Sequence, residues 1–404
     1  MVKRKLAWSA AIALSLFCVS QATAEDKPPF RVGAVLSKTG AYSQQGIFVE
    51  QGLRVGIKRA NAAGGILGRK IELVIRDSAS NPARGLLAAK ELIGEQHVDF
   101  LYPEIISGIA LAELPYTTEQ KMFTIANGAS PQIGDVSKFP YSFQYLDSAT
   151  RRIPAMAAAI KKLGGHKVGI LVSTNPPQQE LGDGLNRDLK AKYGLEVAGY
   201  KQFSVDTKDL SPLLQGLRDA GADIIAFDGA GRDNVRVVMT GIQTLGWDAK
   251  VVGEPAVLYG NLLEQIPPSV AKQFYSINYR VATRTGATTS LLQQYIKDLE
   301  EFGPITNIGF SAAGTDVITI VKWAYEKAQK QFGSVDADRL KTIVEGIDNS
   351  DFKDQHPLLF EKPGYSDKDH TTKNADYSRF WALVHASNPE NGLYEGEDLD
   401  VPND

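Results

Sequence analysis

Residues 33–77 read GAVLSKTGAYSQQGIFVEQGLRVGIKRANAAGGILGRKIELVIRD, and their pattern of apolar and small residues is the clearest indication of the fold class. The apolar run at residues 31–36 predicts a strand, and small or apolar side chains at helical spacing predict a helix over residues 43–62. The glycine pair at 64–65 ends that helix, and the run KIELVI at 70–75 predicts a second strand. A strand, a helix and a strand in this order are typical of a parallel sheet covered by helices.

The same alternation continues along the chain and restarts near Ala149. Short apolar runs predict further strands at residues 98–102, 122–126, 141–145, 166–172, 195–203, 223–227 and 250–253, with amphipathic segments between them. No linker rich in proline, serine or glycine separates the two sets. Two α/β sets joined by short extended segments therefore suggest two lobes that share a hinge.

Composition excludes several classes of protein. The chain has 404 residues, 43% of them apolar and 23% charged, with a net charge of −3, which is unlike a disordered acidic tail or a basic nucleic-acid binder. Its length predicts two or three domains. The single cysteine rules out a disulfide framework and a thiolate metal cluster, and the five histidines are too far apart for a zinc motif.

The first 24 residues have the pattern of a signal peptide. A basic start is followed by an apolar run at residues 6–19 and by the small residues of Ala22-Thr23-Ala24. We expect cleavage after Ala24 and a periplasmic location, because the apolar run is shorter than the ~20 residues of a membrane-spanning helix. A retained hydrophobic N-terminal helix is the alternative. Cleavage also removes Cys18, so the mature chain has no cysteine.

The sequence contains no recognisable catalytic motif. A P-loop, a G-x-S-x-G elbow and an H-E-x-x-H helix are all absent. Gly229-Ala230-Gly231 follows a predicted strand, but Asn234 stands where a dinucleotide loop needs its third glycine, so a plain strand-to-helix turn is the favoured interpretation. We expect a protein that is not an enzyme and that uses no cofactor and no metal.

Three segments carry a resemblance to a known family. The motif NAAGGILGRKIEL at residues 61–73, NPARGLLAAKELI at 81–93 and FSVDTKDLSPLLQGLRDAGADIIAF at 203–227 resemble the leucine/isoleucine/valine-binding protein family. These are periplasmic solute-binding proteins that supply ABC importers. The resemblance implies an α/β fold of two Rossmann-like lobes, each with a parallel sheet flanked by helices, joined by a three-segment hinge as in type I periplasmic binding proteins.

The resemblance also implies where the lobes begin and end. Lobe 1 would take residues 25–145 and 280–352, and lobe 2 would take residues 148–277 and 364–404. The hinge segments would lie near residues 143–147, 275–281 and 358–363. This division agrees with the restart of the strand and helix pattern near Ala149.

The family binds its ligand at the carboxyl ends of the strands, where loops and helix starts present free N–H groups. By resemblance, the ligand carboxylate would be held in lobe 1 by Ser107, Gly128, Ala129 and Ser130. Tyr42 would wall the pocket, although the family commonly has a tyrosine later in that loop, where this chain has Gln44-Gln45.

Lobe 2 is expected to close over the ligand. Glu254 is the best match to the acid that pairs with the ammonium group in the amino-acid binders, and further candidates are Gln178, Gln179, Asp228 and Arg232. The tyrosine expected before Gly182 is Leu181 here. Fewer aromatic walls and an available arginine leave an aromatic or aliphatic carboxylic acid open as the ligand.

The resemblance implies a periplasmic solute-binding component of an ABC importer, which binds a small carboxylate such as a branched-chain amino acid by hinge closure. Its partners would be that small molecule and a membrane permease, with no nucleic acid, and it would act as a monomer. Two alternatives remain open: the same transport role for a carboxylic acid that is not an amino acid, and a ligand-sensing regulator of amide or amino-acid metabolism.

Overall fold

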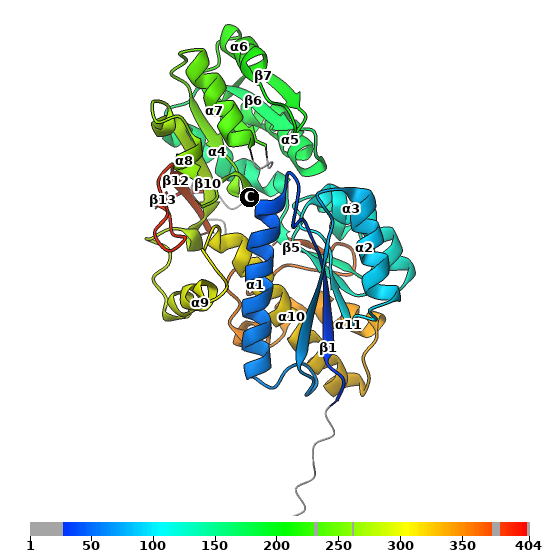
Figure 1. Cartoon of the computed structure of the whole chain (residues 1–404). Helices are drawn as coiled ribbons and strands as arrows, with labels where there is room; N and C mark the ends of the chain where they lie inside the picture. Colours follow the sequence, from blue (N-terminus) through cyan, green and yellow to red (C-terminus); the bar gives the residue numbers. More distant parts are fainter. Residues whose placement is uncertain (1–26, 230–232, 261, 374–379, 402–404) are drawn as a thin grey trace, which may run out of the picture.

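A computed structural model describes residues 27–229, 233–260, 262–373 and 380–401. The expected signal peptide at residues 1–24 and the candidate Arg232 lie outside these residues. The described chain forms two α/β lobes, one above the other in Figure 1, with a six-stranded and a seven-stranded sheet. The predicted α/β class with largely parallel sheets is confirmed.

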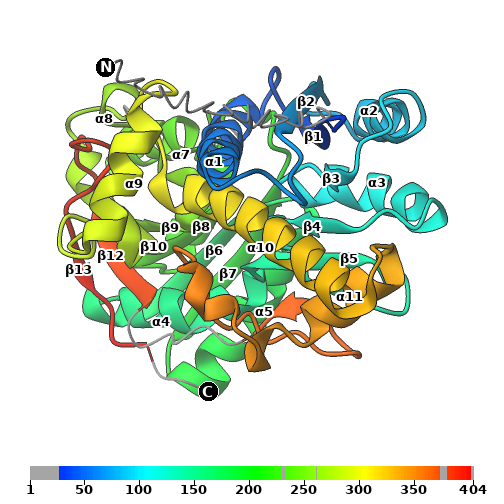
Figure 2. The ribbon, with the colours of Figure 1, turned by 90° about the horizontal axis from the view of Figure 1, so that it is seen from below.

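The sheet of lobe 1 is entirely parallel and has the order β11-β5-β4-β3-β1-β2. The strands are β1 (Phe30–Leu36), β2 (Ile71–Asp77), β3 (Phe100–Tyr102), β4 (Thr124–Ala126), β5 (Ser142–Asp147) and β11 (Thr371–Thr372). The covering helices are α1 (Ser43–Ala62), α2 (Pro82–Gly94), α3 (Ser107–Glu119), α9 (Ser290–Glu300), α10 (Ile308–Phe332) and α11 (Ala337–Glu345). The long helix α10 lies beside α1, while α2 and α3 lie together on the other side of the sheet (Figures 1 and 2).

The sheet of lobe 2 has the order β13-β12-β10-β9-β8-β6-β7, with β12 antiparallel to both of its neighbours. Its strands are β6 (Lys167–Ser173), β7 (Glu196–Phe203), β8 (Ile224–Asp228), β9 (Lys250–Gly253), β10 (Phe274–Tyr279), β12 (Trp381–His385) and β13 (Gly396–Asp398). Its helices are α4 (Ile153–Lys162), α5 (Pro176–Tyr193), α6 (Ser211–Asp219), α7 (Asn234–Thr244) and the short α8 (Leu262–Gln265).

One part of the expected division between the lobes is wrong. The sequence placed residues 364–404 in lobe 2 and a hinge segment near 358–363, but β11 pairs with β5 in the sheet of lobe 1. The Tyr365 hydroxyl donates to the Gln144 carbonyl at 3.0 Å, and His370 Nδ1 donates to the Ser142 carbonyl at 2.9 Å. These bonds hold the chain on lobe 1 through Lys373, so it returns to lobe 2 only at β12.

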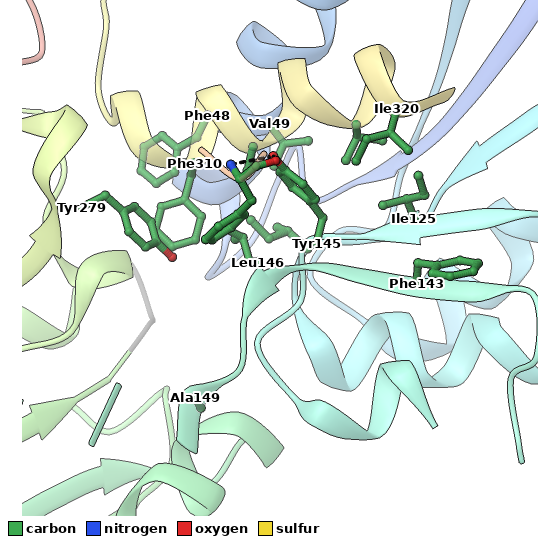
Figure 3. Close-up of a cluster of buried hydrophobic side chains, with 14 of the residues drawn as sticks. Phe48, Val49, Ile125, Phe143, Tyr145, Leu146, Ala149, Tyr279, Phe310 and Ile320 are labelled. Carbon is green, nitrogen blue, oxygen red and sulfur yellow. Dashed lines mark hydrogen bonds between the residues drawn. The ribbon is translucent and has the colours of Figure 1, made fainter. Parts of the chain in front are cut away.

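A buried apolar cluster continues from one lobe into the other through the hinge (Figure 3). Phe310 of α10 stacks on Phe48 of α1 at 6.2 Å between ring centroids and meets the ring of Tyr279 edge-on at 5.9 Å. Tyr279 ends β10, where the chain leaves the sheet of lobe 2. The core therefore holds one end of the hinge against lobe 1. The carboxyl ends of the parallel strands in the two sheets face each other across the space between the lobes.

Candidate functional site

A cavity with an empty volume of about 480 Å³ lies between the lobes, at the carboxyl ends of the strands of both sheets. From lobe 1 it is lined by Tyr42, Gln45, Ile105, Ile106, Ser107, Asn127, Ala129 and Phe310. From lobe 2 it is lined by Arg152, Asn175, Pro177, Gln178, Glu254 and Ala256. The lining is largely apolar with a few polar groups that converge, as is usual for small-molecule sites.

The structure brings five of the expected site residues to the cavity wall: Tyr42, Ser107, Ala129, Gln178 and Glu254. Three others, Gly128, Ser130 and Asp228, do not line the cavity but lie directly behind residues that do. The candidate Gln179 lies on α5 and donates to Gln202 at 3.5 Å, on the exposed side of lobe 2. Sequence reasoning missed Arg152, Asn127, Asn175 and Phe310.

The lobe 1 wall is built around the first turn of α3. Ser107 is its first residue, and no side chain caps this end of the helix. Ser107 Oγ accepts from the Ser130 backbone N–H at 3.0 Å, which holds the loop after β4 against the helix start. A Cβ at Gly128 would meet Ser107 Oγ at 2.9 Å, so only glycine permits this approach. Free N–H groups at a helix start attract a carboxylate.

Asn127 supplies a second polar group on this wall. It is 1% exposed and lines the cavity, and neither its Oδ1 nor its Nδ2 forms a well-made hydrogen bond within the described part of the chain. A buried amide whose hydrogen bonds are incomplete is costly, because its donors and its acceptor have lost water. Ser130 differs, since its hydroxyl already donates to Glu180 at 2.9 Å.

The lobe 2 wall contains two buried acids at the ends of adjacent strands. Asp228 ends β8 and Glu254 follows β9, and both are fully enclosed, at 1% and 0% exposed. Gln178 Nε2 donates to both oxygens of Asp228 at 3.1 and 3.2 Å. Burial raises the pKa of Asp228 well above its ordinary value, and the neighbouring Glu254 carboxylate raises it further.

Arg152 links this wall to the hinge. Its Nη1 donates to Glu254 Oε2 at 2.5 Å and its Nε donates to Asp147 Oδ2 at 2.9 Å. The Tyr279 hydroxyl donates to the other Asp147 oxygen at 2.7 Å. Burial raises the pKa of Glu254, while the Arg152 charge opposes that rise. Arginine is rarely buried without such partners. The pair Arg151-Arg152 directly before an apolar helix is the sequence feature from which a buried arginine at this site could have been predicted.

The two lobes touch across the mouth of the cavity. The Tyr42 hydroxyl of lobe 1 donates to Asn175 Oδ1 of lobe 2 at 3.0 Å. Glu180 on α5 accepts from Ser130 Oγ at 2.9 Å and from Gln132 Nε2 at 2.8 Å, both in lobe 1. These bonds define a closed arrangement of the lobes.

The described residues offer neither a metal site nor a membrane-spanning helix. Those residues contain no group of three or more histidine, cysteine, aspartate or glutamate side chains arranged to hold a metal ion. Their helices also include none with the length and apolar character required to cross a membrane.

Two α/β lobes, a hinge and a cavity lined from both sides define a two-lobed ligand-binding protein. A family model described as periplasmic binding protein matches residues 29–388, and the chain belongs to this family. It is 28% identical over 200 residues to a Leu/Ile/Val-binding protein homologue of Brucella abortus, a match that covers 49% of this chain. The match spans about half of that relative, 53% of its length.

Solved structures share the fold over nearly the whole chain. The substrate-binding protein of a branched-chain amino acid transporter from Streptococcus pneumoniae, in complex with isoleucine, has a TM-score of 0.72 and 18% identity, with 93% of this chain and 100% of that chain covered. An ABC-transporter solute-binding protein from Rhodopseudomonas palustris, in complex with 3,4-dihydroxybenzoic acid, also has a TM-score of 0.72, at 20% identity, with 93% and 98% covered.

Proposed function

We propose that this chain is the solute-binding component of an ABC importer, and that it captures a small carboxylate, foremost a branched-chain amino acid, between its lobes. The observation that carries the proposal is the cavity shared by both lobes, with carboxylate-binding groups on one wall and acids on the other. The protein acts by binding and release and not by catalysis. Residues 1–24 serve as its signal peptide, and the mature chain works in the periplasm as a monomer beside a membrane permease.

Lobe 1 suits the carboxylate end of the ligand. The first turn of α3 offers N–H groups and the Ser107 hydroxyl, and Asn127 adds an amide that lacks a well-formed hydrogen bond in the described structure. A carboxylate placed here is held by dipoles alone, and hydrogen bonds to a charged group contribute about 1.5–3 kcal/mol each. Ile105, Ile106 and Phe310 supply an apolar surface for the rest of the ligand.

Lobe 2 suits an ammonium group. Glu254 lines the cavity with Asp228 behind it, and Arg152 offsets part of their charge. The wall as a whole is acidic, since Asp147, Asp228 and Glu254 face a single guanidinium among the described residues. An α-amino acid therefore matches both walls at once.

A carboxylic acid without an ammonium group is the second candidate. Arg152 also lines the cavity, and a relative of the same fold from Rhodopseudomonas palustris was solved with 3,4-dihydroxybenzoic acid. In this case Asp228 and Glu254 would stay partly protonated and bind as neutral groups.

Titration calorimetry with L-leucine, L-isoleucine and 3,4-dihydroxybenzoate tests the proposal. We expect a branched-chain amino acid to bind with a Kd near the micromolar range, which corresponds to about −8 kcal/mol. Ser107→Ala should weaken binding by about 10- to 100-fold, because one charge-assisted hydrogen bond is lost. Ser137→Ala, which changes an exposed serine that does not line the cavity, is the matched control. Unchanged affinity in Ser107→Ala would remove this site, and binding of the aromatic acid alone would favour the second candidate.

A further inference from the structure

Asp228 and Glu254 lie side by side at the edge of the lobe 2 sheet. Phe227 of β8 pairs with Gly253 of β9 in parallel register, so the next residue of each strand is one of the two acids. Adjacent strands are about 4.8 Å apart, which brings neighbouring side chains on one face into contact. Two carboxyl groups placed side by side in this way can form a hydrogen bond with each other only when one of them carries a proton.

The charges around this pair do not balance if both acids are ionised. Within the described residues, Arg152 forms salt bridges with Asp147 and Glu254, whereas Asp228 forms none. Gln178 donates to Asp228 but carries no charge. A third buried carboxylate facing one guanidinium would be left without a counter-charge, which is costly in an enclosed site.

Two other titratable groups within the described part of the chain face the pair, the Tyr42 and Tyr279 hydroxyls, and neither supplies a positive charge. The Tyr42 hydroxyl lies on the lobe 1 side, and burial together with the Asp206 and Asp228 charges raises its pKa, so it stays neutral. The Tyr279 hydroxyl on the hinge side is bonded to Asp147, and burial raises its pKa well above its ordinary value. Among the residues that the structure describes, a proton on the acid pair is therefore the remaining way to reduce the charge in the ligand-free site.

We propose that Asp228 and Glu254 share one proton when the cavity holds no ligand, and that the ammonium group of an amino acid displaces this proton into the solvent. The inference rests on the proposed function and deepens it. The O–H bond of the protonated acid breaks, its electron pair stays on the carboxylate, and the ammonium charge takes the place of the proton. A carboxylic acid without an ammonium group leaves the proton in place.

This exchange makes amino-acid affinity depend on pH with a defined sign. The ammonium group lowers the pKa of the pair in the complex relative to the free protein. Between those two pKa values the free protein carries the proton and the complex does not, so binding weakens as the pH falls. In this pH range, displacement of one proton raises the Kd about tenfold for each unit by which the pH falls.

The ligand-free half of the proposal is tested without any ligand. Carboxyl carbon shifts of Asp228 and Glu254 are followed by NMR as a function of pH, with Asp228→Asn and Glu254→Gln used for assignment. We expect one of the two carboxyls to titrate well above the ordinary range of aspartate and glutamate. Ordinary titration of both groups would overturn the shared proton, whatever the ligand is.

The ligand-bound half is tested by calorimetry with L-leucine in buffers of different ionisation enthalpy, between about pH 5 and about pH 8. We expect release of about one proton per bound leucine in the natural protein and in Asp183→Asn, an exposed acid on α5 that serves as the control. Asp228→Asn should release none, because its amide donates to Glu254 at every pH. Leucine binding without proton release overturns the inference and leaves the proposed function intact. Failure of every amino acid to bind would instead count against the amino-acid assignment, and the NMR titration still decides the proton.

Discussion

Arg152 holds together a group of buried charged side chains at the cavity and the hinge. Its side chain is 3% exposed and bridges Asp147 and Glu254, both of which are fully buried. Buried ion pairs of this kind add little net stability relative to apolar residues, but removal of one partner leaves uncompensated charge. Loss of the Arg152 side chain should therefore lower the stability of the fold strongly.

We expect Arg152→Met to lower the free energy of unfolding by about 3–5 kcal/mol near neutral pH. Without the guanidinium the pKa values of Glu254 and Asp228 rise further above those of the unfolded chain. An acid whose pKa is raised in the folded state destabilises the fold less when it is protonated. The loss of unfolding free energy in Arg152→Met should therefore become smaller as the pH is lowered. Urea unfolding at about pH 5 and about pH 8 measures this, and Arg187→Met, which removes a surface arginine paired with Asp188, should change the free energy of unfolding little.

A second buried acid sets another pH dependence. Glu104 follows β3, accepts from Ser37 and Ser78 at 2.8 and 2.6 Å, and is enclosed next to the equally buried Glu113. Burial raises the pKa of Glu104 to about 7 from its ordinary 4.5. The folded chain then holds this proton over a pH range in which the unfolded chain has released it.

Stability should therefore decline as the pH rises from about 4.5 to about 7, by roughly 3 kcal/mol from this group. Glu104→Gln keeps a neutral side chain at every pH and should flatten that decline. Thermal unfolding across this pH range decides the matter, with the exposed Glu72→Gln on β2 as the control. A decline of equal size in Glu104→Gln would show that another group is responsible.

Sequence reasoning reached the site only in part, and the reason differs from residue to residue. Ser107 and Glu254 follow predicted strands, so their place at the sheet edge was accessible from pattern and resemblance. Arg152 and Asn127 became site residues through contacts that no local pattern encodes, namely the hinge acid Asp147 and the shape of the cavity.

At the scale of elements, the helices and strands follow the hydrophobic pattern closely, and the exception is informative. Helix α1 was predicted at its observed bounds, because its apolar face and its glycine stop are both local features. Strand β11 was missed, since it has two residues and depends on pairing with β5, more than 200 positions earlier in the chain. The third hinge segment was misplaced for the same reason.

Helix α5 carries the contact that holds the lobes closed. Glu180 accepts two hydrogen bonds from lobe 1, from Ser130 and Gln132, and burial raises its pKa. Because these bonds join the two lobes, we expect them to favour the closed arrangement without touching the ligand.

Glu180→Ala should weaken ligand binding by roughly tenfold, mainly through faster dissociation, because two hydrogen bonds of the closed state are lost. Stopped-flow release of the ligand measures the rate, and small-angle scattering of the ligand-free protein should report a larger radius of gyration. Asp183→Ala, on the exposed side of the same helix, controls for changes in helix stability. Equal dissociation rates in the two variants would show that Glu180 plays no part in closure.

At the scale of the molecule, the ligand wall and the hinge share one group of side chains. Asp147 ends the strand that leaves lobe 1, and Tyr279 ends the strand that leaves lobe 2. Tyr279 also stacks on Trp381, where the chain re-enters lobe 2, at 5.3 Å between ring centroids. Because Arg152 joins Asp147 to Glu254, a change in charge at the cavity reaches the hinge through direct contacts.

Tyr279→Phe tests this link, since it keeps the ring against Trp381 and Phe310 and removes only the hydroxyl that donates to Asp147. We expect a loss of about 1–3 kcal/mol in unfolding free energy, because a buried carboxylate loses a donor. Without that donor, Asp147 interacts more strongly with the Arg152 guanidinium, which then neutralises less of the Glu254 charge. The pH dependence of amino-acid affinity should therefore move to higher pH. Tyr275→Phe, on the same strand with its ring against His385, should change neither property. A stability loss in Tyr279→Phe with no shift in the binding profile would mean that the hydroxyl supports the fold alone, and that the hinge does not sense the charge in the cavity.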